Sequence, residues 1–349
     1  MPRRKHNPWA QLFGRSVALL TGNTLRAGSR MAKQALKPAA QRRAPPPGAG
    51  DWLPGVAIGP GGARRFRLYR PPGVKIGERL PLMVMLHGCG QDAKGFALST
   101  RMNSLATRER FLVLYPEQDR LANAQGCWNW FDTRSGRAYA EATLILAAID
   151  QVCLLYPADR QRVALVGLSA GASMAALLAT RHPQRFKAVV MHSGVPPGSA
   201  HSPMSALRAM HGHQRAALAP VSRPLLQPAP QPLLQTATPG EGSAWPPLLV
   251  IHGADDTVVS ASNGVTAAKV WADATGARAI KSRVVQRGRR HAMTLTDFKR
   301  KGRTVVTLAE VGRLGHAWSG GALKQPFSDA LGPDATRMAW AFALRQFGA

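Results

Sequence analysis

Short runs of apolar residues recur through most of the chain, and most of them are continuous rather than alternating. Continuous apolar runs are typical of strands that are buried on both faces of a sheet. Residues 65–69 instead alternate apolar and polar side chains, which predicts a half-exposed strand. The predicted strands are 65–69, 80–86, 111–115, 162–166, 189–192, 247–251, 283–285 and 304–308.

Stretches with helical periodicity or strong helix formers lie between several of these strands. The predicted helices are 102–110, 139–155, 171–180 and 335–346. Strands that alternate with helices predict a mostly parallel sheet flanked by helices. The predicted fold class is therefore α/β. The segment between the last two predicted strands is interpreted as a very basic link.

The pattern fails in two places, and these set the predicted domain boundaries. Residues 1–50 are predicted to be a basic extension, with an amphipathic helix over 8–20 and a proline-rich linker at 44–50. Residues 212–247 are rich in Pro, Ala, Gln and Leu with little periodicity. They are predicted to be an insertion, either a lid or a disordered segment, within one folded domain at 51–349.

The chain is strongly basic. Its 349 residues carry 46 Lys and Arg against 18 Asp and Glu, a formal net charge of +28. Residues 1–50 hold ten of the basic residues and no acidic one. Such a charge favours anionic neighbours, such as nucleic acid, acidic lipid or a negatively charged polymer surface. The alternative is an arginine-rich composition whose charges are only solvated.

No apolar run approaches the roughly 18 to 20 residues that span a bilayer, so no transmembrane segment is predicted. Arg15 interrupts the only apolar stretch near the N-terminus, and no ordinary signal peptide is visible. The three cysteines, Cys89, Cys127 and Cys153, fit no zinc or redox spacing and allow at most one internal disulfide. The cysteine count therefore leaves the compartment open.

A serine stands between two glycines where a predicted strand meets a predicted helix, in the motif Gly167-Leu168-Ser169-Ala170-Gly171. This arrangement is the nucleophile elbow, a sharp turn that exposes the serine hydroxyl above the sheet edge. The glycines are needed because a side chain beside the turn would collide with its neighbours. The sequence therefore predicts Ser169 as a nucleophile.

A serine needs a base within hydrogen-bond reach, and the base needs a carboxylate to orient it. His316 lies in a glycine-flanked loop and is preferred as the base over His252, His192 and His291. Asp255 and Asp256 both follow the strand at 247–251. Because successive residues point in different directions, only one is expected to face His316, and Asp256 is preferred. The chain order Ser, Asp, His is that of α/β-hydrolases.

The segment His87-Gly88-Cys89-Gly90-Gln91 follows a buried predicted strand. A glycine turn there lets backbone N–H groups face a ligand, so Cys89 and Ala170 are the expected oxyanion-hole donors. His87 is expected to be structural. An aromatic cluster, Cys127-Trp128-Asn129-Trp130-Phe131, either packs in the core or lines a substrate cleft.

Five motifs together resemble the polyhydroxybutyrate (PHB) depolymerase family of esterases. They occur in the family's order over roughly residues 56–321. The motifs are Leu86-His87-Gly88-Cys89, Tyr115-Pro116-Glu117-Gln118, the aromatic cluster at 127–131, the serine motif at 167–171 and Gly315-His316-Ala317-Trp318-Ser319-Gly320-Gly321. The resemblance implies an α/β-hydrolase fold and a Ser-Asp-His carboxylic ester hydrolase that acts on poly(3-hydroxybutyrate) or its oligomers.

The same resemblance carries further expectations. Relatives also cleave feruloyl or acetyl esters on plant polysaccharides, and most are secreted, so an extracellular location is implied; the alternatives are the cytoplasm or a polyester granule surface. Cys89 is implied to pair with Cys127, which leaves Cys153 free. Trp128, Trp130 and Trp318 are the candidate substrate-binding residues. Crystalline polymer is a doubtful substrate, because the chain ends shortly after the His316 loop.

Two hypotheses from different classes follow. In the first, the protein is an esterase that needs neither a metal nor an organic cofactor, with an ester as its substrate. In the second, it is a basic protein that binds nucleic acid or a polyester granule surface and carries a vestigial hydrolase fold. Separately, the N-terminal basic segment is a candidate anchor to an anionic surface beside catalysis. Salt separates the two hypotheses, because phosphate-driven binding weakens steeply with salt and ester turnover does not.

Overall fold

The computed structural model describes residues 46, 48–213 and 245–348. The amphipathic helix predicted at 8–20 and most of the insertion predicted at 212–247 therefore lie outside the described residues.

A single large sheet organises the described residues. Its strand order is β1-β2-β4-β3-β5-β6-β7-β11-β10-β8, with β9 paired to β10. The strands are β1 (Asp51–Gly59), β2 (Gly62–Arg70), β3 (Leu80–Leu86), β4 (Leu112–Pro116), β5 (Ala158–Leu168), β6 (Ala188–His192), β7 (Leu248–Gly253), β8 (Arg278–Ala279), β9 (Arg283–Val285), β10 (Met293–Arg300) and β11 (Arg303–Val311). A separate short pair joins β12 (Trp318–Ser319) to β13 (Ser328–Asp329).

The centre of the sheet is parallel and its edges are antiparallel. Strands β4, β3, β5, β6, β7 and β11 all pair in parallel. At one edge β1 and β2 run antiparallel, and at the other edge β10 runs antiparallel to β11. The parallel strands are buried on both faces, as their apolar runs predict; every residue of β3 is buried. Their carboxyl ends therefore meet at one sheet edge.

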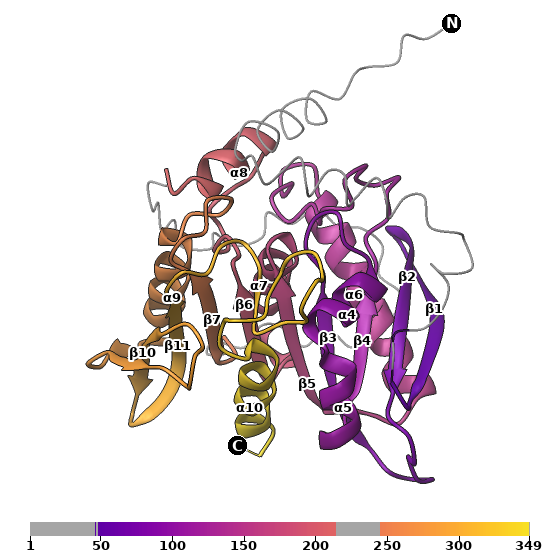
Figure 1. Cartoon of the computed structure of the whole chain (residues 1–349). Coiled ribbons are helices and arrows are strands. Elements are labelled where there is room, and N and C mark those ends of the chain that lie inside the picture. Colours follow the sequence, from indigo (N-terminus) through magenta and orange to yellow (C-terminus); the bar gives the residue numbers. More distant parts are fainter. Residues whose placement is uncertain (1–45, 47, 214–244, 349) are drawn as a thin grey trace, which may run out of the picture.

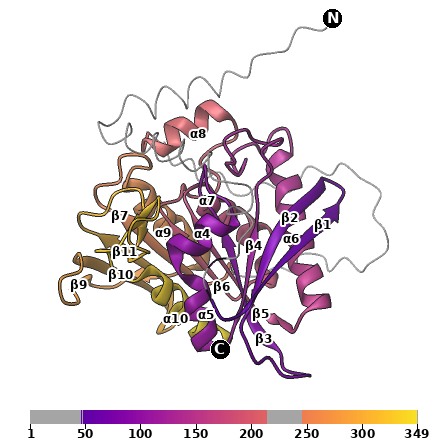
Figure 2. The same ribbon diagram turned by 45° about the vertical axis from the view of Figure 1, so that its right-hand side comes forward.

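Helices cover both faces of the sheet (Figure 1). One core lies between the sheet and α6, α7 and α9, and a second lies under α4, α5 and α10 (Figure 2). The helices are α4 (Ala93–Thr100), α5 (Met102–Glu109), α6 (Arg137–Leu155), α7 (Ala170–Arg181), α8 (Pro203–Met210), α9 (Ser262–Thr275) and α10 (Ala335–Phe347), with a 3₁₀ turn η1 (Pro183–Arg185). The result is a three-layer α/β arrangement.

Helix α6 is long and apolar enough to cross a bilayer by length and composition, and it is the one such helix among the described residues. More than half of its apolar stretch, 56%, is buried inside the protein. Buried residues such as Ile145, Ile149 and Val152 pack into the same core as strands β2, β3 and β5. This burial is that of a core helix.

The predicted strands and helices are all present, but several elements were not predicted. The segment interpreted as a basic link contains β10, whose residues pair with β11. It escaped prediction because most of its residues are polar and only partly buried, although it pairs with β11 on one side and with β8 and β9 on the other. Strand β1 contains Pro54 and Gly55, residues that the sheet tolerates at its edge. Helices α4, α8 and α9 were also missed; α4 and α8 are only 8 residues long.

Candidate active site

Ser169 stands on the turn between β5 and α7. Its φ of 57° and ψ of −122° lie in a region that residues other than glycine rarely adopt. A Cβ on Gly167 would lie 2.2 Å from the carbonyl oxygen of Gly171, and a Cβ on Gly171 would lie 2.1 Å from that of Leu86. The two glycines of the motif are therefore required because backbone segments touch at these points.

A buried acid and a histidine meet near the carboxyl end of β7. The Nδ1 atom of His316 donates to Oδ2 of Asp256 at 2.8 Å. The Asp256 side chain is fully buried, whereas Asp255 is exposed. Because Nδ1 holds the proton in this bond, Nε2 of a neutral His316 ring is left as the basic nitrogen.

Asp256 is held ionised by its neighbours. Burial would raise the pKa of its carboxyl, but hydrogen bonds from His252, His316 and the Val259 amide outweigh burial and hold the pKa below its usual value. The His252 Nε2 contact to Oδ2 is 3.5 Å, longer than that of His316, and His252 Nε2 also lies 2.9 Å from the Val259 carbonyl oxygen. The amide N–H groups of Val258 and Val259 donate to Oδ1 at 3.0 and 2.9 Å. These contacts thus hold the Asp256 carboxylate both in one position and in its ionised form.

His192 connects the serine turn to the His316 loop. Its carbonyl oxygen accepts the N–H of Ser169 at 2.8 Å, and its ring Nε2 accepts the N–H of Ser319 at 3.1 Å. The ring is stacked on Trp318 with centroids 5.1 Å apart. Burial, with smaller contributions from His252 and His316, lowers the pKa of His192 to about 3, so the ring is neutral. One buried residue, through its backbone and its ring together, therefore ties together two loops that are separated by more than a hundred residues.

The two halves of the predicted triad differ in how closely they are joined. Asp256 and His316 are hydrogen-bonded, but no hydrogen bond joins Ser169 Oγ to His316 in the part of the chain that the structure describes. Such contacts are often long in the absence of substrate and tighten when it binds. The competing histidines His192, His252 and His291 are all buried.

The turn after β3 lies against the serine. A Cβ on Gly88 would be 3.5 Å from the Cβ of Ser169, and both Cys89 and Ala170 line the cavity beside it. Among the described residues, no acceptor takes a hydrogen bond from the N–H of Cys89 or of Ala170. Two unpartnered amides beside a serine are the arrangement that binds a developing oxyanion.

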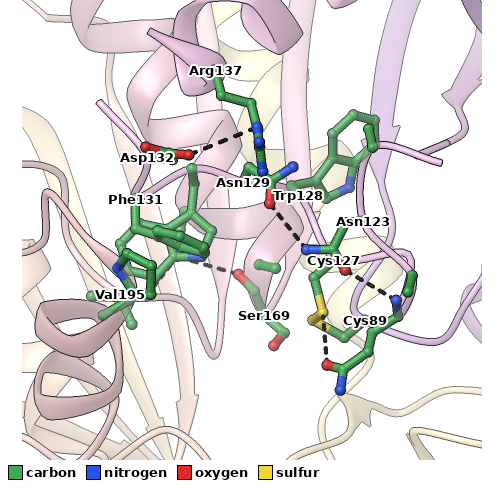
Figure 3. A pocket seen from close by; sticks show the side chains of 18 of the residues that line it. Cys89, Asn123, Cys127, Trp128, Asn129, Phe131, Asp132, Arg137, Ser169 and Val195 are labelled. Atoms are coloured by element: carbon green, nitrogen blue, oxygen red, sulfur yellow. Dashed lines mark hydrogen bonds and ion pairs between the residues drawn. A yellow bond between two sulfur atoms is a disulfide. The ribbon is translucent and has the colours of Figure 1, made fainter. Parts of the chain in front are cut away.

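Ser169 opens onto a cavity of about 260 Å³ (Figure 3). A disulfide between Cys89 and Cys127 stands at one side of it, and Cys153 is a free, buried cysteine. Phe131 and Val195 lie on the opposite side from Trp128. The walls come mainly from the loop 120–132 and from residues around α8. The disulfide thus joins the wall loop to the turn that carries the Cys89 amide.

A buried glutamate fixes the wall loop from behind. Glu141 of α6 accepts hydrogen bonds from the amide and side chain of Asn129 at 2.9 and 2.6 Å, and from Nε2 of Gln118 at 2.7 Å. Asn129 in turn accepts from Asn123 at 3.0 Å, as Figure 3 shows. Sequence reasoning missed Glu141, because a lone glutamate in a helix carries no signal of burial.

The three tryptophans expected at the substrate do not share one place. Trp128 and Trp130 line the cavity. Trp318 does not, and its expected role is corrected: the ring is fully buried, and its indole N–H donates to Thr336 Oγ1 at 3.0 Å. His87 is also buried, and its Nε2 accepts the N–H of Gln118 at 3.1 Å, which is a structural role.

A parallel sheet with a serine turn after β5 and an acid–histidine pair after β7 defines an α/β-hydrolase. The solved structure of acetyl xylan esterase from Aspergillus awamori has the same fold, with a TM-score of 0.57 at 18% identity over 77% of this chain and 94% of that chain. Residues 64–286 match the family described as Esterase PHB depolymerase. The chain belongs to this family.

The chain is also similar to individual enzymes of known name. The chain is 34% identical over 152 residues to poly(3-hydroxyalkanoate) depolymerase C of Paucimonas lemoignei, a match that covers 43% of this chain and 36% of that enzyme. It is 27% identical to feruloyl esterase B of Neurospora crassa over 60% of this chain and 70% of that enzyme. The match to the depolymerase thus spans about a third of its length.

Replacing Gly171 by alanine tests the close packing of the serine turn. The added Cβ would meet the Leu86 carbonyl oxygen at 2.1 Å, where backbone must move. We expect the free energy of unfolding, measured by urea titration, to fall by more than about 2 kcal/mol. Gly59→Ala is the matched control, since its Cβ would only touch Leu144 at 3.4 Å. Equal unfolding midpoints for the two variants would contradict this packing.

His192→Asn tests the buried neutral ring. The folded pKa of about 3 lies below the ordinary 6.5, so between these values only the unfolded chain binds the proton. The contribution of the neutral His192 ring to the free energy of unfolding is therefore complete above pH 6.5. It is lost as the pH falls, by about 2 kcal/mol between pH 7 and 5. Urea unfolding at both pH values should show that the variant lacks this part of the wild-type loss. An unchanged pH dependence would show that the ring is not buried in its neutral form.

Proposed function

We propose that the protein is a serine carboxylic ester hydrolase in which Ser169, His316 and Asp256 form the catalytic triad. The observation that carries the proposal is the buried Asp256–His316 hydrogen bond of 2.8 Å at the sheet edge that also carries the strained serine turn, which opens onto a cavity. His192 supports it, since its bonds to Ser169 and Ser319 keep the two loops close.

Acylation follows from this geometry. His316 Nε2 takes the proton of Ser169 Oγ as the oxygen attacks the ester carbonyl carbon. The carbonyl oxygen gains negative charge and is stabilised by the N–H groups of Cys89 and Ala170. The C–O bond then breaks, and His316 gives its proton to the leaving alcohol. Asp256, which is held ionised, stabilises the transient imidazolium.

Deacylation repeats these steps with water as the nucleophile. His316 removes a proton from a water molecule, whose oxygen attacks the acyl carbon on Ser169. The second tetrahedral intermediate uses the same two amides, and its collapse returns the proton to Ser169 Oγ and releases the carboxylic acid. No hydrogen bond joins Ser169 Oγ to His316 among the described residues, so substrate binding is expected to draw the two together.

The substrate is proposed to be a short hydroxyalkanoate ester or oligomer. Support comes from the relative named as a poly(3-hydroxyalkanoate) depolymerase and from the small cavity, about 260 Å³, below the usual range for drug-sized ligands. Apolar side chains such as Trp130, Phe131 and Val195 suit a short acyl chain. The alternative is a feruloyl or acetylxylan ester, which the relatives with those names support.

An extracellular location is proposed with it. Disulfides persist in oxidising compartments and are rare in the cytosol, and Cys89 and Cys127 form one beside the cavity.

Matched substitutions of the two adjacent acids test the triad. Hydrolysis of p-nitrophenyl butyrate should fall by about a thousandfold or more in Ser169→Ala and in Asp256→Asn, because the nucleophile or the orientation of His316 is lost. Asp255→Asn, at the exposed neighbour, should retain wild-type turnover. A folded Ser169→Ala protein with full activity, or equal losses in both aspartate variants, would end the proposal. A panel of acetyl, hydroxybutyryl and feruloyl esters then ranks the substrates.

Removing the disulfide tests its part in holding the cavity wall. The bridge closes a loop with a sequence separation of 38. Its loss in Cys89→Ala/Cys127→Ala should lower the free energy of unfolding by up to about 4 kcal/mol and reduce turnover. Reductant should reproduce the effect in the wild type, and Cys153→Ala is the control. If reductant changes neither stability nor turnover, the bridge does not hold the wall.

A further inference from the structure

A second cavity, of about 590 Å³, lies between the β9–β10 segment and α10. Figure 2 shows β10 and α10 together at the lower left of the molecule. None of its lining residues lines the cavity at Ser169. It is therefore a separate site, which the proposed function leaves unused.

Positive charge surrounds this second cavity. Four arginines line it, against a single acid, Asp334. The arginines are Arg101, Arg287, Arg290 and Arg337. They come from the α4–α5 junction, the β9–β10 segment and α10, so segments far apart in sequence place their charges around one space. Such a cluster favours an anionic ligand.

Two of these arginines are positioned by the protein through neutral groups. Arg290 Nη1 donates to the Gly332 carbonyl oxygen at 2.5 Å, and Arg101 Nη2 donates to that of Gly320 at 2.5 Å. A carbonyl oxygen orients a guanidinium but does not neutralise its charge. These side chains are therefore fixed in place with their charge uncompensated.

The other two arginines are available to a ligand. Within the described residues, the Arg287 side chain has no hydrogen-bond or salt-bridge partner. Arg337 contacts Asp334 only at 3.6 Å, and 69% of its side chain is exposed. Exposed pairs of this length contribute little, so Arg337 can turn to another anion at small cost.

A buried polar atom also belongs to this cavity. His291 lines it and is 8% exposed, and its Nδ1 has no hydrogen-bond partner among the described residues. Its Nε2 contacts Asp329 at 3.3 Å, which fixes the ring. Buried polar atoms are normally paired, so an unpaired one beside a cavity indicates a missing partner, which is a hydrogen-bond donor such as a hydroxyl group where the ring carries its one proton on Nε2.

The rest of the lining is apolar. Val285, Met293, Pro333, Met338 and Ala341 complete the wall. A small inorganic ion would leave this apolar surface uncovered. A ligand with an anionic head and an aliphatic body would satisfy both parts of the cavity at once.

We propose that this cavity binds an aliphatic carboxylate, with its head between Arg287 and Arg337 and its chain along the apolar wall. A hydroxyalkanoate oligomer acid and a fatty acid share this chemistry. The proposal does not depend on catalysis at Ser169, because the two cavities have no lining residue in common.

Calorimetric titration of the full chain carrying Ser169→Ala tests the site without hydrolysis. Hexanoate should bind, and hexanamide, its neutral counterpart, should not bind measurably. Arg287→Gln and Arg337→Gln should each raise the dissociation constant about tenfold, since each removes a charged hydrogen-bond donor. Arg289→Gln is the matched control, because Arg289 is an exposed neighbour that does not line the cavity.

Any of several results would overturn the proposal. They are equal binding of hexanamide, tighter binding of inorganic phosphate than of hexanoate, and an equal loss in Arg289→Gln and Arg287→Gln. Absence of hexanoate binding at millimolar concentration would overturn it as well. The dimer of 3-hydroxybutyrate, used in the same titration, separates the two sources: tighter binding than hexanoate assigns the oligomer acid, and weaker binding assigns a fatty acid. Ester turnover plays no part in this readout, so failure here leaves the proposed function standing.

Discussion

The hydrogen bonds of one buried histidine hold the serine turn and the His316 loop in their relative positions. His192 ends a central strand, accepts the N–H of Ser169 through its backbone and accepts the N–H of Ser319 through its ring. This second bond requires an unprotonated ring nitrogen, and burial ensures it by lowering the pKa of His192 to about 3. The local geometry therefore depends on a side chain that lines neither the cavity at Ser169 nor the one beside α10, and its neutrality follows from its burial in the core.

Buried carboxylates likewise hold the loops around the cavity at Ser169. Glu141, buried in α6, accepts two hydrogen bonds from Asn129 of the wall loop and a third from Gln118, just before that loop. Asp256 accepts two backbone N–H groups while its other oxygen faces His316. Buried charges persist only when such partners compensate for the lost solvent. These carboxylates are satisfied by short, directed bonds, which gives the loops a fixed shape before any ligand enters.

Much of the positive charge on the chain belongs to the folded domain rather than to its N-terminal segment alone. The arginines around α10 include residues from the basic stretch before β10, and they surround a space whose wall is otherwise apolar. These arginines are more than a solvated surface, because backbone carbonyl groups orient two of them, Arg101 and Arg290. One buried imidazole nitrogen near them, Nδ1 of His291, also lacks a partner among the described residues. The two cavities thus differ in chemistry: one presents a serine and free amides, the other presents cations.

The sequence by itself determined the central strands, the serine turn and the candidates Ser169 and His316, and it narrowed the acid to two adjacent residues, because each depends on local features: apolar runs, paired glycines and chain order. Only the tertiary structure decided which of Asp255 and Asp256 faces His316, that Trp318 packs inside rather than at the cavity, and that β10 exists within a basic stretch. It alone revealed Glu141, the bridging role of His192 and the grouping of Arg287 with Arg337. The physical reason is the same in each case. Burial, contact across the sheet and edge pairing arise between segments distant along the chain, and no local pattern encodes them.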